Sequence, residues 1–538
     1  MYFPDPHRAL RAHAGVTLIL FLTIGGCASL PPGSAAPKRT SMAFVHPETT
    51  GLGQPFEVAA RKHPGESAFR MISVGADGFA VRMQMIAAAE HSLDLQYFIF
   101  RGDTTGRLIT GALLGAADRG VHLRLLLDDG DTVPGDEQLV ALAAHPQVEI
   151  RIFNPFFYRG HRSWIRDLEF SLNPARLDYR MHNKLLVADN AAALIGGRNI
   201  GDAYFQIDAA SQFADDDVFA AGPVVRSLSA TFDEFWNSGL AIPVEALHGG
   251  RPPQAALDAR RAELAAELQQ AEESVVPYVV RAGSGEPLAG IMGGRLPVVW
   301  STVQVAYDSP EKRRVRSGAI PGRLMYESVA AAAASVQSEL LMITPYLVPT
   351  EQELQILSTL RAHNARVRIL TNSLESTNVL AAHSAYAGLR TQLVQDGIEL
   401  YEVRAALGTT SKGSGQTAAI SRAGNYGLHA KLFVFDQQSL FLGSMNFDRR
   451  SARINTEIGL IIASPELAQQ TAARFTAMVQ PVSAYHVILA IDQGGAQHLR
   501  WRTEEGGQAV EYAQEPSTHP GRKSAATLLA LLPLDGEL

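Results

Sequence analysis

The distribution of apolar and polar positions along the chain predicts strands that alternate with helices. Residues 92–100, SLDLQYFIF, have the composition of a buried strand, and residues 104–120, TTGRLITGALLGAADRG, have the apolar spacing of a helix with a polar start and a glycine stop. Residues 121–129, VHLRLLLDD, have the composition of a second strand. Because strands joined by one crossover helix lie parallel, the segment predicts a β-α-β unit in a parallel sheet.

The same order of elements recurs in the second half of the chain. Residues 339–349, 350–363 and 365–373 again have the patterns of a strand, a helix and a strand. Tyr97 precedes His182 by 85 residues and Tyr346 precedes His429 by 83 residues, so the two copies have nearly the same spacing. We therefore predict a duplicated α/β fold, with homologous halves at residues 63–240 and 301–480.

The segments outside these halves differ in composition. Residues 27–62 are rich in small residues and proline, which is typical of a flexible tether. Residues 241–300 connect the halves, and their Ala-, Glu- and Arg-rich stretch at 256–275 predicts a surface helix. Residues 481–538 form a C-terminal extension. Its last part, 522–538, combines two cations with an apolar stretch, which suits either a membrane interface or packing onto the core.

The N-terminal segment, residues 1–26, has the layout of a secretory signal peptide. Arg8 and Arg11 precede an apolar run at about residues 15–24, which is too short to span a bilayer comfortably. The following Ile-Gly-Gly-Cys resembles a bacterial lipoprotein box, in which the cysteine, here Cys27, becomes the lipidated first residue. An ordinary signal peptide or short anchor is the alternative. Every one of these interpretations places the body of the protein outside the cytoplasm.

Composition excludes several classes of site. A chain of 538 residues with 46% apolar content can bury a sizeable core. The formal net charge of -7 argues against a protein that coats nucleic acid. Cys27 is the one cysteine, so neither an internal disulfide nor a thiolate metal cluster can form. The sequence contains neither HExxH nor GxxxxGK[ST], and we infer no zinc site, no ATP site and no cofactor.

Two copies of one polar motif carry the candidate chemistry. The first copy comprises His182, Lys184, Asp189, Gly197 and Asn199, and the second comprises His429, Lys431, Asp436, Ser444 and Asn446. The intervals within the two copies are identical. A histidine and a lysine two residues apart on a strand share a face, so a nucleophile or proton carrier would lie beside a fixed positive charge. A single pair is ordinarily a surface histidine beside a solvated lysine. Two copies with identical spacing favour a site that binds a tetrahedral anion, and a phosphodiester is the natural candidate.

Both copies resemble the HxKxxxxD motif of the phospholipase D superfamily. Outside the motifs, GGRNIGDAYF, SLDLQYFIF, GSMNFDRRSARINTEIGL and LLALLPLDGEL resemble the bacterial cardiolipin synthase branch, most closely its C type. The similarity covers nearly all of residues 60–538. It implies two phospholipase D-like α/β domains packed about a pseudo-twofold axis, with one shared active site.

The resemblance also implies a two-step displacement through a phosphohistidine. By the usual order in the superfamily, His182 is the nucleophile and His429 the general acid and base. The lysines, Asn199 and Asn446 would hold the phosphate oxygens, with Gly197 and Ser444 in the substrate-binding set.

A carboxylate is needed to fix the tautomer of each histidine. Glu457 stands where the family places such a group, eight residues before Pro465, and Asp215 stands eight residues before Pro223. Asp217 shares the strand face of Asp215 and remains an alternative. Asp189 and Asp436 follow the motif strands at a turn, where a structural role is as plausible as a chemical one.

The function that we expect is transfer of a phosphatidyl group onto the hydroxyl of another phospholipid, which makes cardiolipin. The alternatives are a phospholipase D that forms phosphatidic acid, a superfamily nuclease, and a lipid-binding envelope protein with a relic site. The expected partners are phosphatidylglycerol, with phosphatidylethanolamine as a further candidate, and the membrane surface, without nucleic acid. These features fit a lipoprotein that is anchored in the cell envelope and faces the periplasm. The sequence does not decide between the inner and the outer membrane, and it does not decide whether a protein partner is needed.

Overall fold

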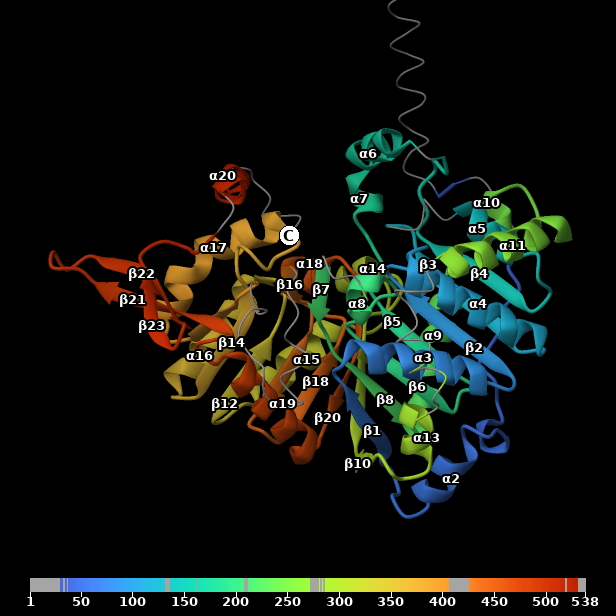
Figure 1. The fold of residues 1–538 in the computed structure, drawn as a ribbon, viewed down its shortest axis with the longest axis horizontal. Helices are drawn as coiled ribbons and strands as arrows, with labels where there is room; N and C mark the ends of the chain where they lie inside the picture. The colour runs from blue at the N-terminus through green and yellow to red at the C-terminus, as the bar shows by residue number, and fades with distance from the viewer. Residues whose placement is uncertain are drawn as a thin grey trace, which may run out of the picture.

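The computed structural model describes residues 30–530 except 32–33, 36, 131–135, 161, 208–210, 271–279, 281–282, 284–285, 406–424 and 518–519. The predicted signal peptide and Cys27 lie outside these residues. Within them, no helix combines the length and the apolar character needed to cross a membrane. The described chain forms two α/β halves, each built on a large mixed sheet with helices packed against it (Figure 1). The predicted fold class is confirmed.

The first half contains a nine-stranded sheet in the order β10-β1-β8-β6-β5-β2-β3-β4-β9. Its strands are β1 (Ser67–Ile72), β2 (Ser92–Tyr97), β3 (His122–Asp128), β4 (Val148–Phe153), β5 (Lys184–Ala188), β6 (Ala192–Gly196), β8 (Asp217–Ala221), β9 (Ala241–Pro243) and β10 (Val299–Ser301). Strands β2 and β3 pair in parallel, and helix α4 (Thr104–Asp118) connects them. The β-α-β unit predicted for residues 92–129 is therefore confirmed.

The second half contains a ten-stranded sheet in the order β11-β20-β18-β17-β12-β14-β15-β21-β22-β23. Its strands are β11 (Val303–Tyr307), β12 (Glu339–Ile343), β14 (Arg366–Asn372), β15 (Glu399–Val403), β17 (Leu432–Phe435), β18 (Ser439–Gly443), β20 (Ile458–Ile462), β21 (Ala484–Ile491), β22 (Gln497–Glu505) and β23 (Gln508–Tyr512). Strands β12 and β14 pair in parallel around helix α16 (Glu351–Ala362), whose N-terminus carries a Thr350–Glu353 capping box. This unit repeats the order of the first half.

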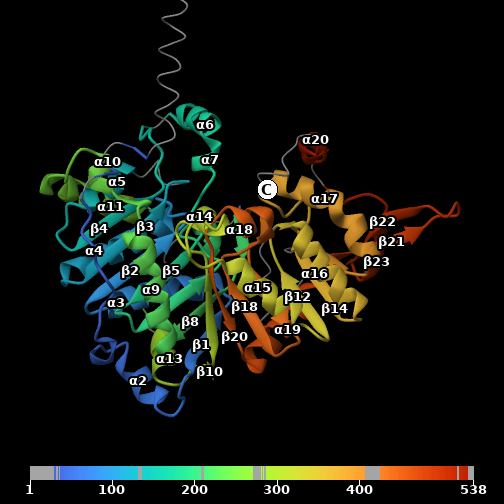
Figure 2. The same ribbon diagram turned by 180° about the vertical axis from the view of Figure 1, so that it is seen from behind.

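Besides α4 and α16, further helices pack against the faces of both sheets, as Figure 2 shows from behind. In the first half they are η1 (Pro47–Thr49), α2 (Gln54–Ala60), α3 (Gly75–Ala88), α5 (Asp136–Leu142), α6 (Ser163–Leu172), α7 (Pro174–Leu177), α8 (Asp202–Phe205), α9 (Pro223–Asn237), α10 (Val244–Leu247), α11 (Gln254–Gln270) and α13 (Glu286–Met292). In the second half they are α14 (Lys312–Arg316), α15 (Met325–Ala334), α17 (Leu380–Gln395), α18 (Arg449–Arg453), α19 (Pro465–Met478) and α20 (Pro520–Leu529).

One hydrophobic cluster runs through both halves. It includes Val187 and Ile195 from β5 and β6 of the first half, and Val434 and Leu442 from β17 and β18 of the second. Two short two-stranded sheets complete the fold, β7 (Ser211–Ala214) with β16 (Asn425–Leu428) and β13 (Leu347–Val348) with β19 (Phe447–Asp448). The β7–β16 sheet joins strands from different halves, and its residues lead directly to His429.

The prediction of a flexible tether at residues 27–62 is wrong from residue 37 onward. Leu52 and Phe56 are buried in the core of the first half. The Lys38 ammonium donates hydrogen bonds to the carbonyls of Ser238 and Gly239 at 3.1 and 3.0 Å. The proline and glycine content suggested a tether, but these apolar side chains have a core within reach, and burying them orders the segment.

The predicted borders at residues 240 and 480 cut through sheets. Strands β9 and β10 of the connection extend the first sheet, and β21, β22 and β23 of the extension continue the second. Helix α11 fits the predicted surface helix and buries Leu257 and Leu264. Helix α20 packs on α17, where the Ser384 hydroxyl donates to the Ala526 carbonyl at 2.9 Å. One side of this part of the C-terminus therefore packs onto the body, as one of the two expected alternatives required.

Candidate active site

Each motif histidine is held by the backbone of the opposite half. Strands β5 and β17 begin only at Lys184 and Leu432, so both histidines stand just before a strand rather than within it. The His182 amide donates to the carbonyl of Thr456 at 2.9 Å, and the His429 amide donates to the carbonyl of Ala214 at 2.8 Å. These equivalent contacts bring the two motifs together at the interface between the halves.

The carboxylates that orient the histidines also cross between the halves. His182 Nδ1 lies 2.9 and 3.1 Å from the two carboxylate oxygens of Glu457, and His429 Nδ1 lies 2.6 Å from Oδ2 of Asp215. Asp217, the alternative to Asp215, instead accepts hydrogen bonds from the guanidinium groups of Arg82 and Arg198 at 2.8 and 3.0 Å. With Nδ1 bonded to a carboxylate, the Nε2 atom of each imidazole is left for the reaction.

Both motif lysines are buried beside their histidines. Lys184 Nζ donates to the His182 carbonyl at 2.6 Å. Lys431 Nζ lies 2.5 Å from the carbonyl oxygen of His429 and 3.1 Å from the Nδ1 atom of the same histidine. Burial lowers the pKa of Lys431 to about 8, and it lowers the pKa of Lys184 well below its ordinary value. The two Nζ atoms lie where an anion could be bound, and the negative charge of a bound anion would raise both pKa values and favour the ammonium form.

Burial and positive charge keep the imidazoles uncharged. Burial, reinforced by the ammonium of Lys431, lowers the pKa of His429 to about 3, and burial with Lys184 and Lys431 lowers the pKa of His182 well below 6.5. The two carboxylates differ. Burial raises the pKa of Glu457, whereas at Asp215 the effect of burial is outweighed by His429, Lys431 and Arg198, so the pKa of Asp215 is lowered. The negative charge is thus firmest beside His429.

Residues 83–236 and 329–479 match the family model described as cardiolipin synthase, PLD-like domain. The chain belongs to this family. It is 34% identical to cardiolipin synthase C of Escherichia coli K12 over 484 residues, which cover 88% of this chain and 97% of that relative. An uncharacterised protein of Helicobacter pylori strain 26695 is 28% identical over 510 residues, covering 93% of this chain and 95% of that protein.

A solved structure of phosphatidylserine synthase from Haemophilus influenzae Rd KW20 shares the fold. It matches with a TM-score of 0.50 and 13% identity, covering 79% of this chain and 90% of that one. The family match and these similarities establish a phospholipase D-type enzyme with two phospholipase D-like domains, as the paired motifs predicted.

The aspartates of the family motif lie at the far end of each motif strand from the histidine. The Asp189 carboxylate accepts hydrogen bonds from the amides of Glu90, His91 and Ser92 at 2.7–2.9 Å. Asp436 does the same for the amides of residues 337, 338 and 339 at 2.7–2.9 Å. Both have left-handed backbones, with φ of 53° and 52°. The structure therefore places both aspartates of the predicted catalytic motif where they hold the loop before β2 or β12, at the strand end opposite the imidazoles.

The four residues predicted to bind substrate divide into two kinds. The Gly197 position leaves room for Asp215, because a Cβ there would stand 2.1 Å from a carboxylate oxygen, and the Ser444 hydroxyl donates to Glu457. Both thus serve the orienting carboxylates. Asn199 accepts from the Ile99 amide at 3.1 Å and donates to Tyr204 at 3.0 Å. The buried carbonyl oxygen of Asn446 has no hydrogen-bond partner among the residues that the structure describes. A substrate contact at these positions stays a prediction.

Sequence reasoning missed two residues that position the histidines. Asp128 Oδ2 accepts the Met181 amide at 2.7 Å, and Asn372 accepts the Leu428 amide at 2.8 Å and donates to the Leu428 carbonyl at 2.9 Å. Met181 and Leu428 directly precede His182 and His429. Asp128 and Asn372 end the equivalent strands β3 and β14, so comparing the duplicated halves at their strand ends would have found them.

Proposed function

We propose that this protein is a cardiolipin synthase-like phosphatidyltransferase that moves a phosphatidyl group between phospholipids through a phosphohistidine intermediate. The observation that carries the proposal is the crossed arrangement of His182 with Glu457 and His429 with Asp215. Neither half supplies a histidine with its own carboxylate, so the two copies of the motif form one site with two imidazoles, as a two-step displacement requires.

In the first step, Nε2 of His182 attacks the phosphorus of the donor lipid. The phosphorus–nitrogen bond forms, the bond to the leaving alcohol breaks, and His429 donates a proton to the departing oxygen. In the second step, a hydroxyl of the acceptor lipid attacks the phosphorus while His429 takes its proton, and His182 leaves. The buried ammonium groups of Lys184 and Lys431 stabilise the phosphate oxygens during both displacements.

The difference between the two carboxylates supports this division of roles. The arriving phosphodiester brings negative charge, which raises the pKa of a nearby imidazole. Asp215, whose pKa is lowered, favours the added proton on His429, whereas Glu457, whose pKa is raised, offers less charge to His182. His182 therefore stays neutral and nucleophilic.

Phosphatidylglycerol is the proposed donor and acceptor, with phosphatidylethanolamine as an alternative lipid. Exchange of one phosphodiester for another conserves that bond, so the reaction can run outside the cytoplasm without nucleotide-activated lipids. His182 and His429 are only 7% and 5% exposed, which favours a lipid hydroxyl over water as the acceptor. Hydrolysis to phosphatidic acid is the competing outcome.

The test is incubation of the purified protein with labelled phosphatidylglycerol, with and without phosphatidylethanolamine, followed by identification of the products by mass. We expect cardiolipin, accompanied by glycerol from phosphatidylglycerol alone or by ethanolamine when the second lipid takes part. His182→Ala is the matched inactive control. If phosphatidic acid is the product under both conditions, the protein is a phospholipase D rather than a transferase.

We also propose that Cys27 carries an acyl anchor that holds the enzyme in the cell envelope, facing the periplasm. The support is the signal-like start of the chain and the position of its one cysteine. Cys27→Ser should abolish incorporation of labelled palmitate and reduce the share of protein in the membrane fraction. An intact variant with unchanged palmitate labelling would contradict the anchor.

A further inference from the structure

Helix α6 presents an apolar stripe to solvent. Trp164, Leu168 and Leu172 follow one another at four-residue intervals, so they lie along one side of the helix. Their exposed fractions are 59%, 51% and 53%, and Phe157, which precedes the helix, is 51% exposed. Large apolar side chains that gather on a surface indicate an interaction site, because single exposed residues are common but clusters are not.

The other side of α6 is already packed against the body of the protein. The Glu169 carboxylate accepts hydrogen bonds from the amides of Phe157 and Tyr158 at 2.7 and 2.9 Å. The Arg166 guanidinium lies 4.0 Å from the ring centroid of Phe156. The helix is therefore fixed by its polar side, and its apolar stripe has no core of its own to enter.

This stripe lies on the segment that leads into the active site. The chain runs from α6 through α7 to His182, which stands ten residues after Leu172. Asp178 lies between α7 and His182. It forms an ion pair with Arg450 of α18 and a second one, at 3.8 Å, with Arg313 of α14. The segment between α6 and His182 is therefore held against α14 and α18.

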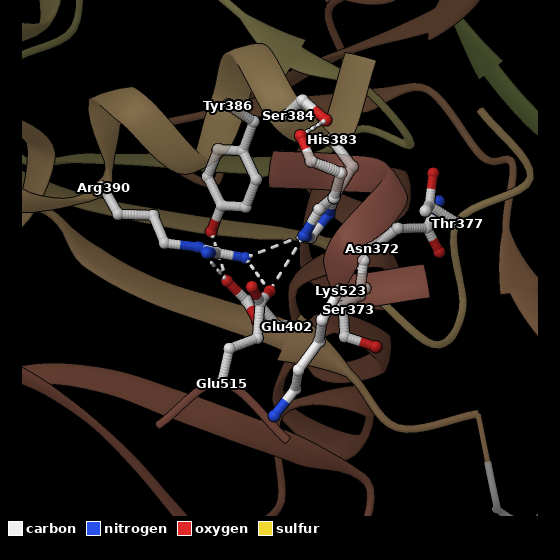
Figure 3. A network of polar contacts seen from close by, with 12 residues as sticks. Asn372, Ser373, Thr377, His383, Ser384, Tyr386, Arg390, Glu402, Glu515 and Lys523 are labelled. Carbon is white, nitrogen blue, oxygen red and sulfur yellow. Dashed lines mark hydrogen bonds and ion pairs between the residues drawn. The ribbon is translucent and has the colours of Figure 1, made fainter. Parts of the chain in front are cut away.

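Helix α20 lies at the same end of the molecule, on the other half (Figures 1 and 2). Leu528 is 64% exposed. The helix is anchored by Arg522, which donates to the carbonyls of Leu374 and Thr377 at 3.1 and 2.6 Å. Figure 3 shows the chain before α20 held by Glu515, which bonds Arg390 and lies 2.8 Å from His383.

The exposed charges near α6 differ from its composition. Residues 157–177 contain four arginines against one aspartate and one glutamate, but Arg159 and Arg166 pair with Asp129 and Arg176 pairs with Glu169, so Arg162 and Asp167 are the exposed charges of this segment. Helix α14 adds the exposed Arg314 and Arg316. An aromatic and aliphatic stripe with exposed arginines on α14 and at Arg162 is complementary to an anionic lipid interface.

We infer that α6, together with α20 on the other half, is the face by which the enzyme docks on an anionic phospholipid bilayer. Docking would bring the phosphodiester of a membrane lipid to His182 and His429 without extraction of the whole lipid. The inference rests on the proposed function, because a lipid substrate is what makes the bilayer the occupant of this face. A second copy of the chain is the competing occupant.

The test measures binding of the full chain to phosphatidylglycerol vesicles by sedimentation, in a Cys27→Ser background that removes any acyl anchor. Leu168→Glu places a charge in the stripe. Ile491→Glu is the matched control, because Ile491 is an aliphatic side chain, 69% exposed, on the β21–β22 hairpin that points away from α6. Leu168→Glu should weaken binding by about tenfold or more, and Ile491→Glu by less than about twofold.

Activity separates this inference from the proposed function. On vesicles, Leu168→Glu should lose about tenfold or more in rate, by the same weakening of binding. On dihexanoyl phosphatidylglycerol below its aggregation concentration it should match the parent, which also shows that it is folded. If the parent transfers neither substrate, the proposed function fails while the vesicle result still decides docking. Unchanged vesicle binding by Leu168→Glu would overturn docking. Docking would also be overturned if the parent forms a dimer in the absence of lipid and Leu168→Glu dissociates that dimer.

Tryptophan fluorescence gives a second measurement on the unaltered stripe. Of the four tryptophans in the chain, Trp236 and Trp501 are buried and Trp300 is half-buried, whereas Trp164 is exposed. Brominated phosphatidylglycerol vesicles should therefore quench the parent and leave Trp164→Phe almost unquenched. Equal quenching of the two proteins would place the contact elsewhere and contradict the inference.

Discussion

At the residue scale, the chemistry depends on two imidazoles that are buried, uncharged and bonded to carboxylates through Nδ1. The same burial that lowers their pKa also leaves the two histidines only 7% and 5% exposed to solvent. The two sites differ mainly in the carboxylate, since Asp215 holds its charge more firmly than Glu457. That difference is the basis for the distinct roles that we propose for His182 and His429.

We predict that His182→Ala and His429→Ala both abolish phosphatidyl transfer but fail at different steps. Without His182 no covalent intermediate can form. Without His429 attack can still occur when the leaving group departs unprotonated, as nitrophenolate does from a nitrophenyl phosphodiester. The His429 variant should give a burst of nitrophenolate and a phosphohistidine at His182, detected by mass spectrometry.

The outcome for the His182→Ala variant decides which histidine is the nucleophile and which is the general acid. A burst in the His182 variant, with phosphorus on His429, would reverse the assignment of nucleophile and acid. No adduct in either variant or in the unaltered enzyme would rule out the covalent mechanism.

The motif lysines predict a descending limb in the pH profile. Burial lowers the pKa of Lys431 to about 8, so its ammonium loses the proton as the pH rises through about 8. Because the charged form stabilises the phosphate oxygens, kcat/KM should fall above that pH. Lys431→Arg keeps its charge and should move the fall to higher pH, even if its maximum rate is lower. An unshifted alkaline limb in that variant would assign the limb to another group.

At the element scale, the motif strands are fixed at both ends by different means. At one end the backbone of each histidine is held by the opposite half, and at the other end Asp189 or Asp436 binds three successive amides of the loop before β2 or β12. The aspartate therefore sets how each motif strand lies against its antiparallel neighbour, β2 or β12.

We predict that Asp189→Ala destabilises the fold without removing the chemistry. Asp189 is fully buried, so three amides would lose their acceptor, at a cost on the order of 3 kcal/mol in the free energy of unfolding. Asp436→Ala should cost about 1 kcal/mol, since water can reach the exposed amides at residues 337 and 338. Urea unfolding measures both values. A stable Asp189→Ala protein with kcat reduced by orders of magnitude would restore a chemical role.

At the scale of the whole molecule, the two halves share both the active site and a hydrophobic cluster. Val187 and Ile195 pack in the same cluster as Val434 and Leu442, and the β7–β16 pair bridges the halves next to His429. Separation of the halves would expose this apolar surface and remove the carboxylate partner of each histidine.

We therefore predict that the two halves unfold in one transition, with a calorimetric enthalpy close to the van't Hoff enthalpy. Leu442→Ala, in the shared cluster, should cost about 3 kcal/mol and move the whole transition to lower temperature. Leu360→Ala, at a buried site in the core of the second half, is the comparison. Two resolved transitions, only one of which responds to Leu442→Ala, would show that the halves are independent.

The sequence by itself determined the duplication, the β-α-β units and the paired motifs, because strand and helix periodicity and the spacing within each motif are local properties. It also pointed to Asp215 and Glu457, since each stands at the same distance before a proline in its own half. Within the described residues it could not reveal that residues 37–62 pack onto the first half, because that depends on where an apolar surface is left open.

Only the tertiary structure decided which carboxylate serves which histidine. Periodicity describes one half at a time, whereas the bonds from His182 to Glu457 and from His429 to Asp215 span 275 and 214 residues. The tertiary structure likewise distinguished Asp215 from Asp217, which share a strand face in the sequence pattern. Once the halves are packed, Asp215 contacts the imidazole of His429, whereas Asp217 contacts the guanidinium of Arg198. Contacts between distant segments are fixed by the burial of shared surface, and no local pattern of residues records that geometry.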